Sequence, residues 1–307
     1  MKSGFTLIEL SIVLIIIGLI TGGVLVGQDL ISAATIRAQI SQIEKYQTAV
    51  NTFRGKYGYL PGDIPDPVAT QYGFKPRGTD CNGTACPGEG DGDGILLGTN
   101  NPPIAYGVAN GGGETAEFWV DLSTAKLLDG SFTVANETQL GGAPLDITNL
   151  YQYFPFAKLG RQNYVYVFSG GSGAPGVWNS SGFNYFGIQY IKQLYTWAYD
   201  ARVAMTVAEA YAIDRKIDDG MPQTGRVTAQ FVSYYNGVGY GLTWAAGGGN
   251  AWGGGVGGNQ GASDTSPTFP TADTCYDNAN SNGQPQQYSM GQNNGTGINC
   301  ALSFKFQ

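Results

Sequence analysis

The chain has 307 residues, enough for one large domain or two small ones, and it contains 48 glycines and no histidine. Without histidine the commonest general base and zinc ligand is missing, which argues against an enzyme. The net charge is -7 and only 13% of the residues are charged, so no basic face for nucleic acid is expected.

The N-terminal segment is apolar from Phe5 to Ile20, except for Glu9. The 17 residues from Leu10 to Val26 carry no charge, near the lower limit for a membrane-spanning helix. No A-x-A cleavage site follows, so we expect the segment to stay on the mature protein. A charge in a membrane segment costs about 2.5 to 3.5 kcal/mol and by default marks function. The alternative is a signal-anchor helix whose Glu9 snorkels to the interface.

Helical spacing continues beyond the apolar segment, on two neighbouring stripes of residues. These stripes comprise Ile36, Ile40, Ile43 and Val50, and Tyr46, Phe53 and Tyr57. The pattern predicts one N-terminal helix over 5–57, with a transmembrane part at 5–27 and an amphipathic stalk at 28–57. Pro61, Pro65 and Pro67 forbid further helix, so a globular head is expected over 58–307.

The stretch Gly4-Phe5-Thr6-Leu7-Ile8-Glu9-Leu10 resembles the cleavage and methylation motif of type IV pilins and of the pseudopilins of type II secretion. The resemblance is strong from residue 2 to about 30. It implies that a prepilin peptidase removes a leader, 1–4, by cutting after Gly4, and methylates the new amino group of Phe5. It also implies an inner-membrane anchor with a periplasmic head, which later joins a periplasmic or cell-surface filament of pilins or pseudopilins through an assembly platform protein.

The same resemblance gives Glu9 an assembly role. In the filaments of this family, Glu9 of an incoming subunit is thought to neutralise the Phe5 amine of its neighbour. Opposite charges attract strongly in hydrocarbon because its dielectric constant is low. Many major pilins have a proline where this chain has Val26, and this difference favours a minor pilin or a pseudopilin.

The four cysteines allow three pairings, of which the simplest joins sequence neighbours. Cys81 would then pair with Cys86 and Cys275 with Cys300, in an oxidising compartment. Four free thiols in a cytosolic protein are the alternative. The region 275–300 is similar to the C-terminal disulfide-bounded region of many pilins.

A Gly-rich stretch, GEGDGDGIL, resembles the first half of a calcium loop. It would offer Glu89, Asp91, Asp93 and the Ile95 carbonyl to a calcium ion, but its twelfth position is Asn100, where a glutamate is expected. The alternative is an acidic surface turn.

The head is expected to be α+β, with an antiparallel sheet packed on the stalk helix, extra helices and Gly-rich loops. Alternating patterns predict strands over 163–170, 182–191, 238–244 and 298–306. A short helix is expected over 114–128, with Phe118, Leu122 and Ala125 inward. A longer helix is expected over 191–217, and its inward residues would be Leu194, Trp197, Ala201, Ala204, Ala208 and Tyr211.

A second acidic cluster follows the longer predicted helix, at Asp214, Asp218 and Asp219. Because acidic residues are unfavourable at a helix C-terminus, we expect Arg215 and Lys216 to compensate them; a bound cation is the alternative.

These features predict a structural subunit of a type IV pilus-like filament, a minor pilin or pseudopilin, with no enzymatic activity. Two alternatives remain at this point: a type II secretion pseudopilin, or a filament-tip adhesin that binds glycan or a surface through aromatic and Gly/Asn-rich loops. The sequence does not choose between a pilus, a secretion system and a DNA-uptake apparatus.

Overall fold

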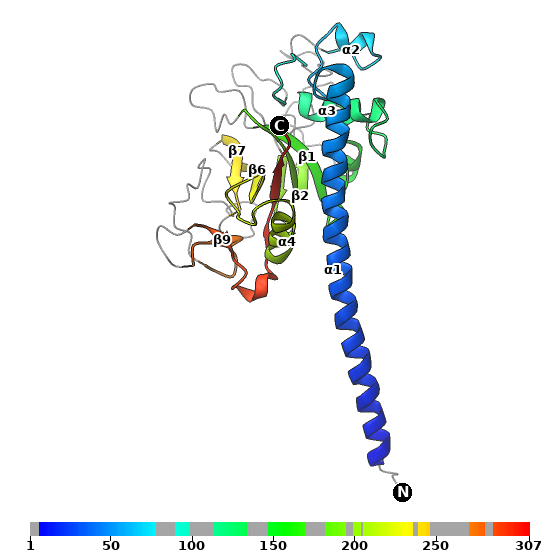
Figure 1. The fold of residues 1–307 in the computed structure, drawn as a ribbon, viewed down its shortest axis with the longest axis vertical. Helices are drawn as coiled ribbons and strands as arrows, with labels where there is room; N and C mark the ends of the chain where they lie inside the picture. The colour runs from blue at the N-terminus through cyan, green and yellow to red at the C-terminus, as the bar shows by residue number, and fades with distance from the viewer. Residues whose placement is uncertain are drawn as a thin grey trace.

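The computed structural model describes residues 6–77, 90–98, 113–133, 135, 147–169, 182–194, 199–203, 205–235, 239–245, 270–279 and 285–307. Figure 1 shows one long helix, α1, with the head packed along its upper half and the lower half extending alone toward the N-terminus. The glycine-rich stretch 246–261 lies outside the described residues.

Helix α1 spans Leu7–Tyr57, 51 residues or about 77 Å at 1.5 Å per residue. It begins at the N-cap Thr6, and it ends where Gly58 takes a left-handed conformation with φ of 84°. Glycine adopts this conformation without steric cost, so Gly58 is a favourable helix stop. The long N-terminal helix predicted from the apolar pattern is confirmed.

The remaining elements belong to the head. The helices and 3₁₀ turns are α2 (Val68–Gln71), α3 (Gly113–Thr124), η1 (Ile147–Gln152), α4 (Val207–Ile217) and η2 (Asn293–Gly295). The strands are β1 (Asn163–Ser169), β2 (Asn184–Leu194), β3 (Tyr199–Arg202), β4 (Met205–Thr206), β5 (Val227–Thr228), β6 (Gln230–Tyr235), β7 (Gly239–Trp244), β8 (Tyr276–Asp277), β9 (Gln287–Tyr288), β10 (Ile298–Cys300) and β11 (Leu302–Lys305).

A five-stranded antiparallel sheet is the centre of the head, in the order β1-β2-β11-β5, with β3 also paired to β2. Strand β11 comes from the C-terminal end of the chain, and its Phe304 lies opposite Phe186 of β2. Three two-stranded sheets, β10-β4, β6-β7 and β8-β9, complete the described strands. The predicted α+β class is therefore confirmed.

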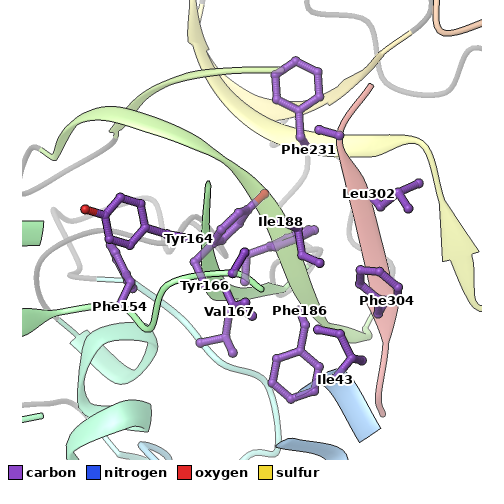
Figure 2. Packing of buried hydrophobic residues seen from close by; sticks show 14 of the residues in the cluster. Ile43, Phe154, Tyr164, Tyr166, Val167, Phe186, Ile188, Phe231, Leu302 and Phe304 are labelled. Carbon is purple, nitrogen blue, oxygen red and sulfur yellow. The ribbon is translucent and has the colours of Figure 1, made fainter. Parts of the chain in front are cut away.

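The upper half of α1 packs on this sheet through aromatic and branched side chains. Figure 2 shows Ile43 of α1 beside Phe186 and Phe304 of the sheet. The Tyr46 ring meets the Trp119 ring of α3 edge-on, with centroids 5.1 Å apart. Phe53, which is completely buried, packs on Tyr57 at 4.6 Å between centroids. Such aromatic contacts add to the free energy gained from burial.

Two buried glutamines of α1 also fix the head on the stalk. The Gln39 Oε1 accepts a hydrogen bond from the Leu159 backbone N–H at 3.1 Å. The Gln42 Oε1 accepts from the Lys158 N–H at 3.0 Å, while its Nε2 donates to the Phe156 carbonyl at 2.8 Å. These bonds satisfy backbone groups of the segment before β1, which would otherwise be costly to bury against a helix.

The long helix predicted over 191–217 was wrong. Strand β2 continues to Leu194, strands β3 and β4 follow, and the helix begins only at Val207. The β2 and β3 backbones pair with each other from Tyr190 to Arg202, so tertiary pairing overrides the helical spacing.

The inward face of this helix differs too. Val207, Ala210 and Ile213 are buried, whereas Ala208 and Tyr211 are half-buried. Trp197 and Ala204 lie outside the described residues. Thr206 is the N-cap, and it forms a capping box with Glu209, a T-x-x-E signal that the sequence contained.

Candidate functional site

The lower half of α1 has no packing partner among the described residues. All of its residues from Leu7 to Ala34 are exposed except Gly27, which is half-buried. These include large apolar side chains such as Leu19 and Ile31, which are 72% and 67% exposed. Among the described helices, α1 alone has the length and composition to cross a membrane. An apolar helix surface of this size requires a membrane or another protein to cover it.

Glu9 stands at the first turn of this helix and is bound by Thr6. Its Oε2 accepts hydrogen bonds at 2.8 Å from both the backbone N–H and the hydroxyl of Thr6, and the Thr6 hydroxyl accepts from the Glu9 N–H at 3.3 Å. This arrangement is a capping box, which satisfies free N–H groups at the helix start. The T-x-x-E spacing signals it in the sequence. Gly4 and Phe5, the residues of the predicted cleavage site, lie outside the described residues.

A cluster of carboxylates joins the segment that follows α1, the GDGDGIL loop and the start of α3. Asp63, Asp91 and Glu114 each place one carboxylate oxygen within 4.8 Å of the others. Asp63 and Glu114 are each only 1% exposed, whereas Asp91 is exposed. Two glycines allow this close approach: a Cβ on Gly62 would lie 2.3 Å from the Glu114 carbonyl, and one on Gly90 would lie 2.1 Å from the Ile64 carbonyl.

The two buried carboxylates hold the GDGDGIL loop by its backbone. Asp63 accepts hydrogen bonds from the N–H groups of Gly92 at 2.9 Å and Gly94 at 3.1 Å. Glu114 accepts from the N–H groups of Asp91 at 3.3 Å and Leu97 at 2.8 Å. The loop is therefore wrapped around carboxylates that come from outside it.

The ligand set predicted from the sequence differs from this cluster. Asp91 belongs to the cluster, but Asp93 accepts a hydrogen bond from the Ile95 N–H at 2.6 Å, within the loop itself. Glu89 and Asn100 lie outside the described residues. Sequence reasoning missed Asp63 and Glu114 as partners of this loop because both are distant along the chain, and no local spacing links them to it.

The cluster is short of positive charge. Farther along α3, Glu117 and Asp121 form ion pairs with the buried Arg77, at 3.0 and 2.6 Å. Within the part of the chain that the structure describes, no lysine or arginine forms an ion pair with Asp63, Asp91 or Glu114. Burial raises the pKa of Asp63 to about 7 and the pKa of Glu114 well above its usual value. Oxygen ligands of this kind can bind a proton or a hard cation.

The second acidic cluster is satisfied differently from the prediction. Buried Asp214 accepts hydrogen bonds from the Tyr288 hydroxyl at 2.8 Å and the Gly220 N–H at 3.2 Å. Asp218 accepts from the N–H groups of Arg226 and Val227, and Asp219 from the Met221 N–H and the Thr224 hydroxyl. Arg215 and Lys216 lie in the last turn of α4, as the prediction requires, but among the described residues no ion pair joins them to these carboxylates, whose hydrogen bonds come from backbone and hydroxyl donors.

Cys275 and Cys300 form a disulfide with a Cα–Cα distance of 5.1 Å. Both cysteines are buried, and the bond ties the segment that leads into β8 to the end of β10. Tyr288 lies within this disulfide-bounded region, so its hydrogen bond to Asp214 attaches the region to α4. Cys81 and Cys86 lie outside the described residues.

Comparisons with known proteins bear on the first residues of the chain. Residues 1–25 match the family model described as the prokaryotic N-terminal methylation motif. Neither a curated protein nor a solved structure matches the chain. The motif implies processing by prepilin peptidase and assembly with other pilins, and with the apolar helix it fits membrane anchoring before assembly. The chain thus carries the methylation motif that is the hallmark of type IV pilins and pseudopilins.

Proposed function

We propose that this chain is a structural subunit of a type IV pilus-like filament, in the minor pilin or pseudopilin class. It is cut after Gly4, methylated at Phe5 and held in the bacterial inner membrane with its head in the periplasm. An assembly platform protein then incorporates it into a periplasmic or cell-surface filament. The observation that carries the proposal is the exposed apolar half of α1, whose first residues belong to a prepilin-type motif.

The role of Glu9 follows from this setting. Cleavage creates an ammonium group at Phe5, and the Glu9 carboxylate of a second subunit is its counter-charge in the filament. Among the described residues of one chain, Glu9 is bound only by Thr6. Pairing with a neighbour adds a full opposite charge in a low-dielectric setting, where the attraction is strong. Assembly therefore satisfies two charges that are costly when the subunit is alone.

The first test of the proposal is Glu9→Val. We expect cleavage after Gly4 to continue, while the variant is lost from the sheared filament fraction. Asp29→Val is the matched control, because it removes another exposed carboxylate of α1 and should incorporate normally. Thr6→Ala removes the side-chain cap but keeps Glu9, so it should also incorporate if it is cleaved. Normal incorporation of Glu9→Val would contradict the pairing.

We further propose that the head binds calcium through Asp63, Asp91 and Glu114. Three observations support this site: the calcium-like sequence of the loop, the convergence of the three carboxylates, and the lack of a cationic partner among the described residues. Calcium would neutralise the buried charge and hold the loop to the N-terminal end of α3. Extracellular calcium sites often have weak, millimolar affinity, which is sufficient outside the cytoplasm.

The calcium site is tested by thermal unfolding of the purified full-length protein in detergent. Millimolar calcium should raise the Tm by several degrees, and magnesium should raise it less. The Asp63→Asn and Glu114→Gln variants should lose most of this shift, whereas Asp129→Asn, an exposed acid just beyond α3, should keep it. An unchanged Tm of the wild-type protein in calcium would refute the site.

A further inference from the structure

An exposed stripe of the stalk carries two opposite charges on one line. Arg37 and Glu44 are both exposed and are seven residues apart, almost two full turns of α1. At 100° per residue they lie within about 20° of each other around the helix. Arg37 lies about 120° from buried Ile43, and Glu44 about 120° from buried Val50.

Neither charged side chain has a hydrogen-bond or ion-pair partner among the described residues. The two residues are about 10.5 Å apart along the helix axis, beyond the three- or four-residue spacing at which side chains of one helix meet. Ser41 and Thr48, which are also exposed, flank Glu44 on this side and are small enough to allow another helix to approach.

We propose that Arg37 of one subunit pairs with Glu44 of the neighbouring copy in the filament, as a second charge pair that sets the axial register. This inference rests on the proposed function. Arg37 and Glu44 lie at different heights on each helix. In two identical, parallel helices, Arg37 of one therefore faces Glu44 of the other only when one helix is displaced along the other. The order of the two charges along α1 also fixes the direction of that displacement.

The displacement required agrees with the pairing proposed for Glu9. To bring Phe5 of an upper subunit to the height of Glu9 of a lower one, the two helices must be displaced along their axis by four residues, about 6 Å. The same shift brings Glu44 of the lower subunit to within about 4.5 Å, along the axis, of Arg37 of the upper one. A larger shift, of up to about 10.5 Å, brings the two residues closer still. A shift in the opposite direction separates them to about 16.5 Å.

Charge reversal tests this contact, in cells that overproduce the chain together with its assembly machinery. Arg37→Glu and Glu44→Arg should each lower the amount of the chain in the sheared filament fraction by about fivefold or more, because like charges then face each other. The double variant Arg37→Glu/Glu44→Arg should restore incorporation to within about twofold of wild type. Lys45→Glu is the matched control. Lys45 is exposed but lies about 100° around the helix from Glu44, and its charge change equals that of Arg37→Glu.

The outcomes separate this contact from the function on which it rests. All four variants should keep the wild-type Tm, because the substituted residues are exposed. If wild type enters the filament but the double variant remains as poor as the single ones, or if Lys45→Glu is equally impaired, the Arg37–Glu44 contact is refuted and the function stands. If wild type itself is absent from the filament, both are refuted.

Discussion

The two halves of α1 follow one helical path but meet opposite surroundings. From Gln39 to Tyr57 the helix buries Ile43, Val50 and Phe53 in the head and offers Gln39 and Gln42 to its backbone. From Leu7 to Ala34 it is at least as apolar, yet none of the described residues covers it. The upper half therefore contributes to folding, and the lower half is available to a membrane or to other subunits.

This difference explains why one continuous helix can serve two states. The amphipathic upper half needs one apolar side, since the head covers only that side. The lower half is apolar all round, which suits lipid at first and neighbouring helices later. Substitutions in the two halves should therefore affect different measurements.

The largest effect is expected from Phe53→Ala in the upper half. Phe53 is fully buried against Tyr57 and Phe74, and removing such a ring typically costs about 3 to 5 kcal/mol of unfolding free energy. Leu30→Ala is the matched truncation in the lower half, where Leu30 is 67% exposed. Denaturation of the purified protein should show a loss of stability for Phe53→Ala only. Equal losses in both variants would contradict the division of α1.

A smaller effect is expected from the pH dependence of head stability. Burial, together with the charges of Asp219 and Asp218, raises the pKa of Asp214 to about 7, while its Tyr288 and Gly220 partners act in the opposite direction. A raised pKa means that the folded state binds a proton that the unfolded state releases above pH 4. Stability should therefore fall as the pH rises from about 4 to 7, and then level off.

The contribution of Asp214 is isolated by Asp214→Asn, which keeps the size of the side chain and cannot ionise. The wild-type Tm should fall by several degrees more than the variant Tm over this pH range, with calcium held constant. Because Tyr288 of the disulfide-bounded region contacts Asp214, the loss of stability at higher pH should be seen in that region first, for example by amide exchange. Parallel pH curves for the two proteins would show that Asp214 is not the titrating group.

The smallest effect is expected from Gln42→Ala. This change leaves the Lys158 N–H without its acceptor and the Phe156 carbonyl without its donor. Each buried group left unsatisfied costs about 1 to 3 kcal/mol, partly relieved where water can enter. Gln47→Ala, a half-buried neighbour on α1, should change the unfolding free energy by less than about 0.5 kcal/mol. If Gln42→Ala changed the unfolding free energy as little as Gln47→Ala, the glutamine bonds would not fix the head on the stalk.

The parts of the fold with strong local patterns could be predicted from the sequence. The long helix, four regions of strand and the inward Phe118 and Leu122 of α3 follow from periodicity alone. The region after Ile191 could not be predicted in this way, because its alanines and aromatics fit a helix locally and only pairing with β2 makes them strands.

The candidate sites divide in the same way. Glu9 is recognisable in the sequence as a single charge in an apolar run, and the T-x-x-E spacing predicts its capping box. The loop acids Asp91 and Asp93 are visible as a pattern, but no local rule connects them with Asp63 and Glu114. That connection requires the close approach at Gly62 and Gly90, which is a property of the folded chain.

The most direct test of the central claim is the mass and N-terminal sequence of the protein purified from cells that contain an active prepilin peptidase. The account predicts a mature chain that begins at Phe5 and carries one methyl group on its amino terminus. A full-length chain that retains Met1 in those cells would contradict it.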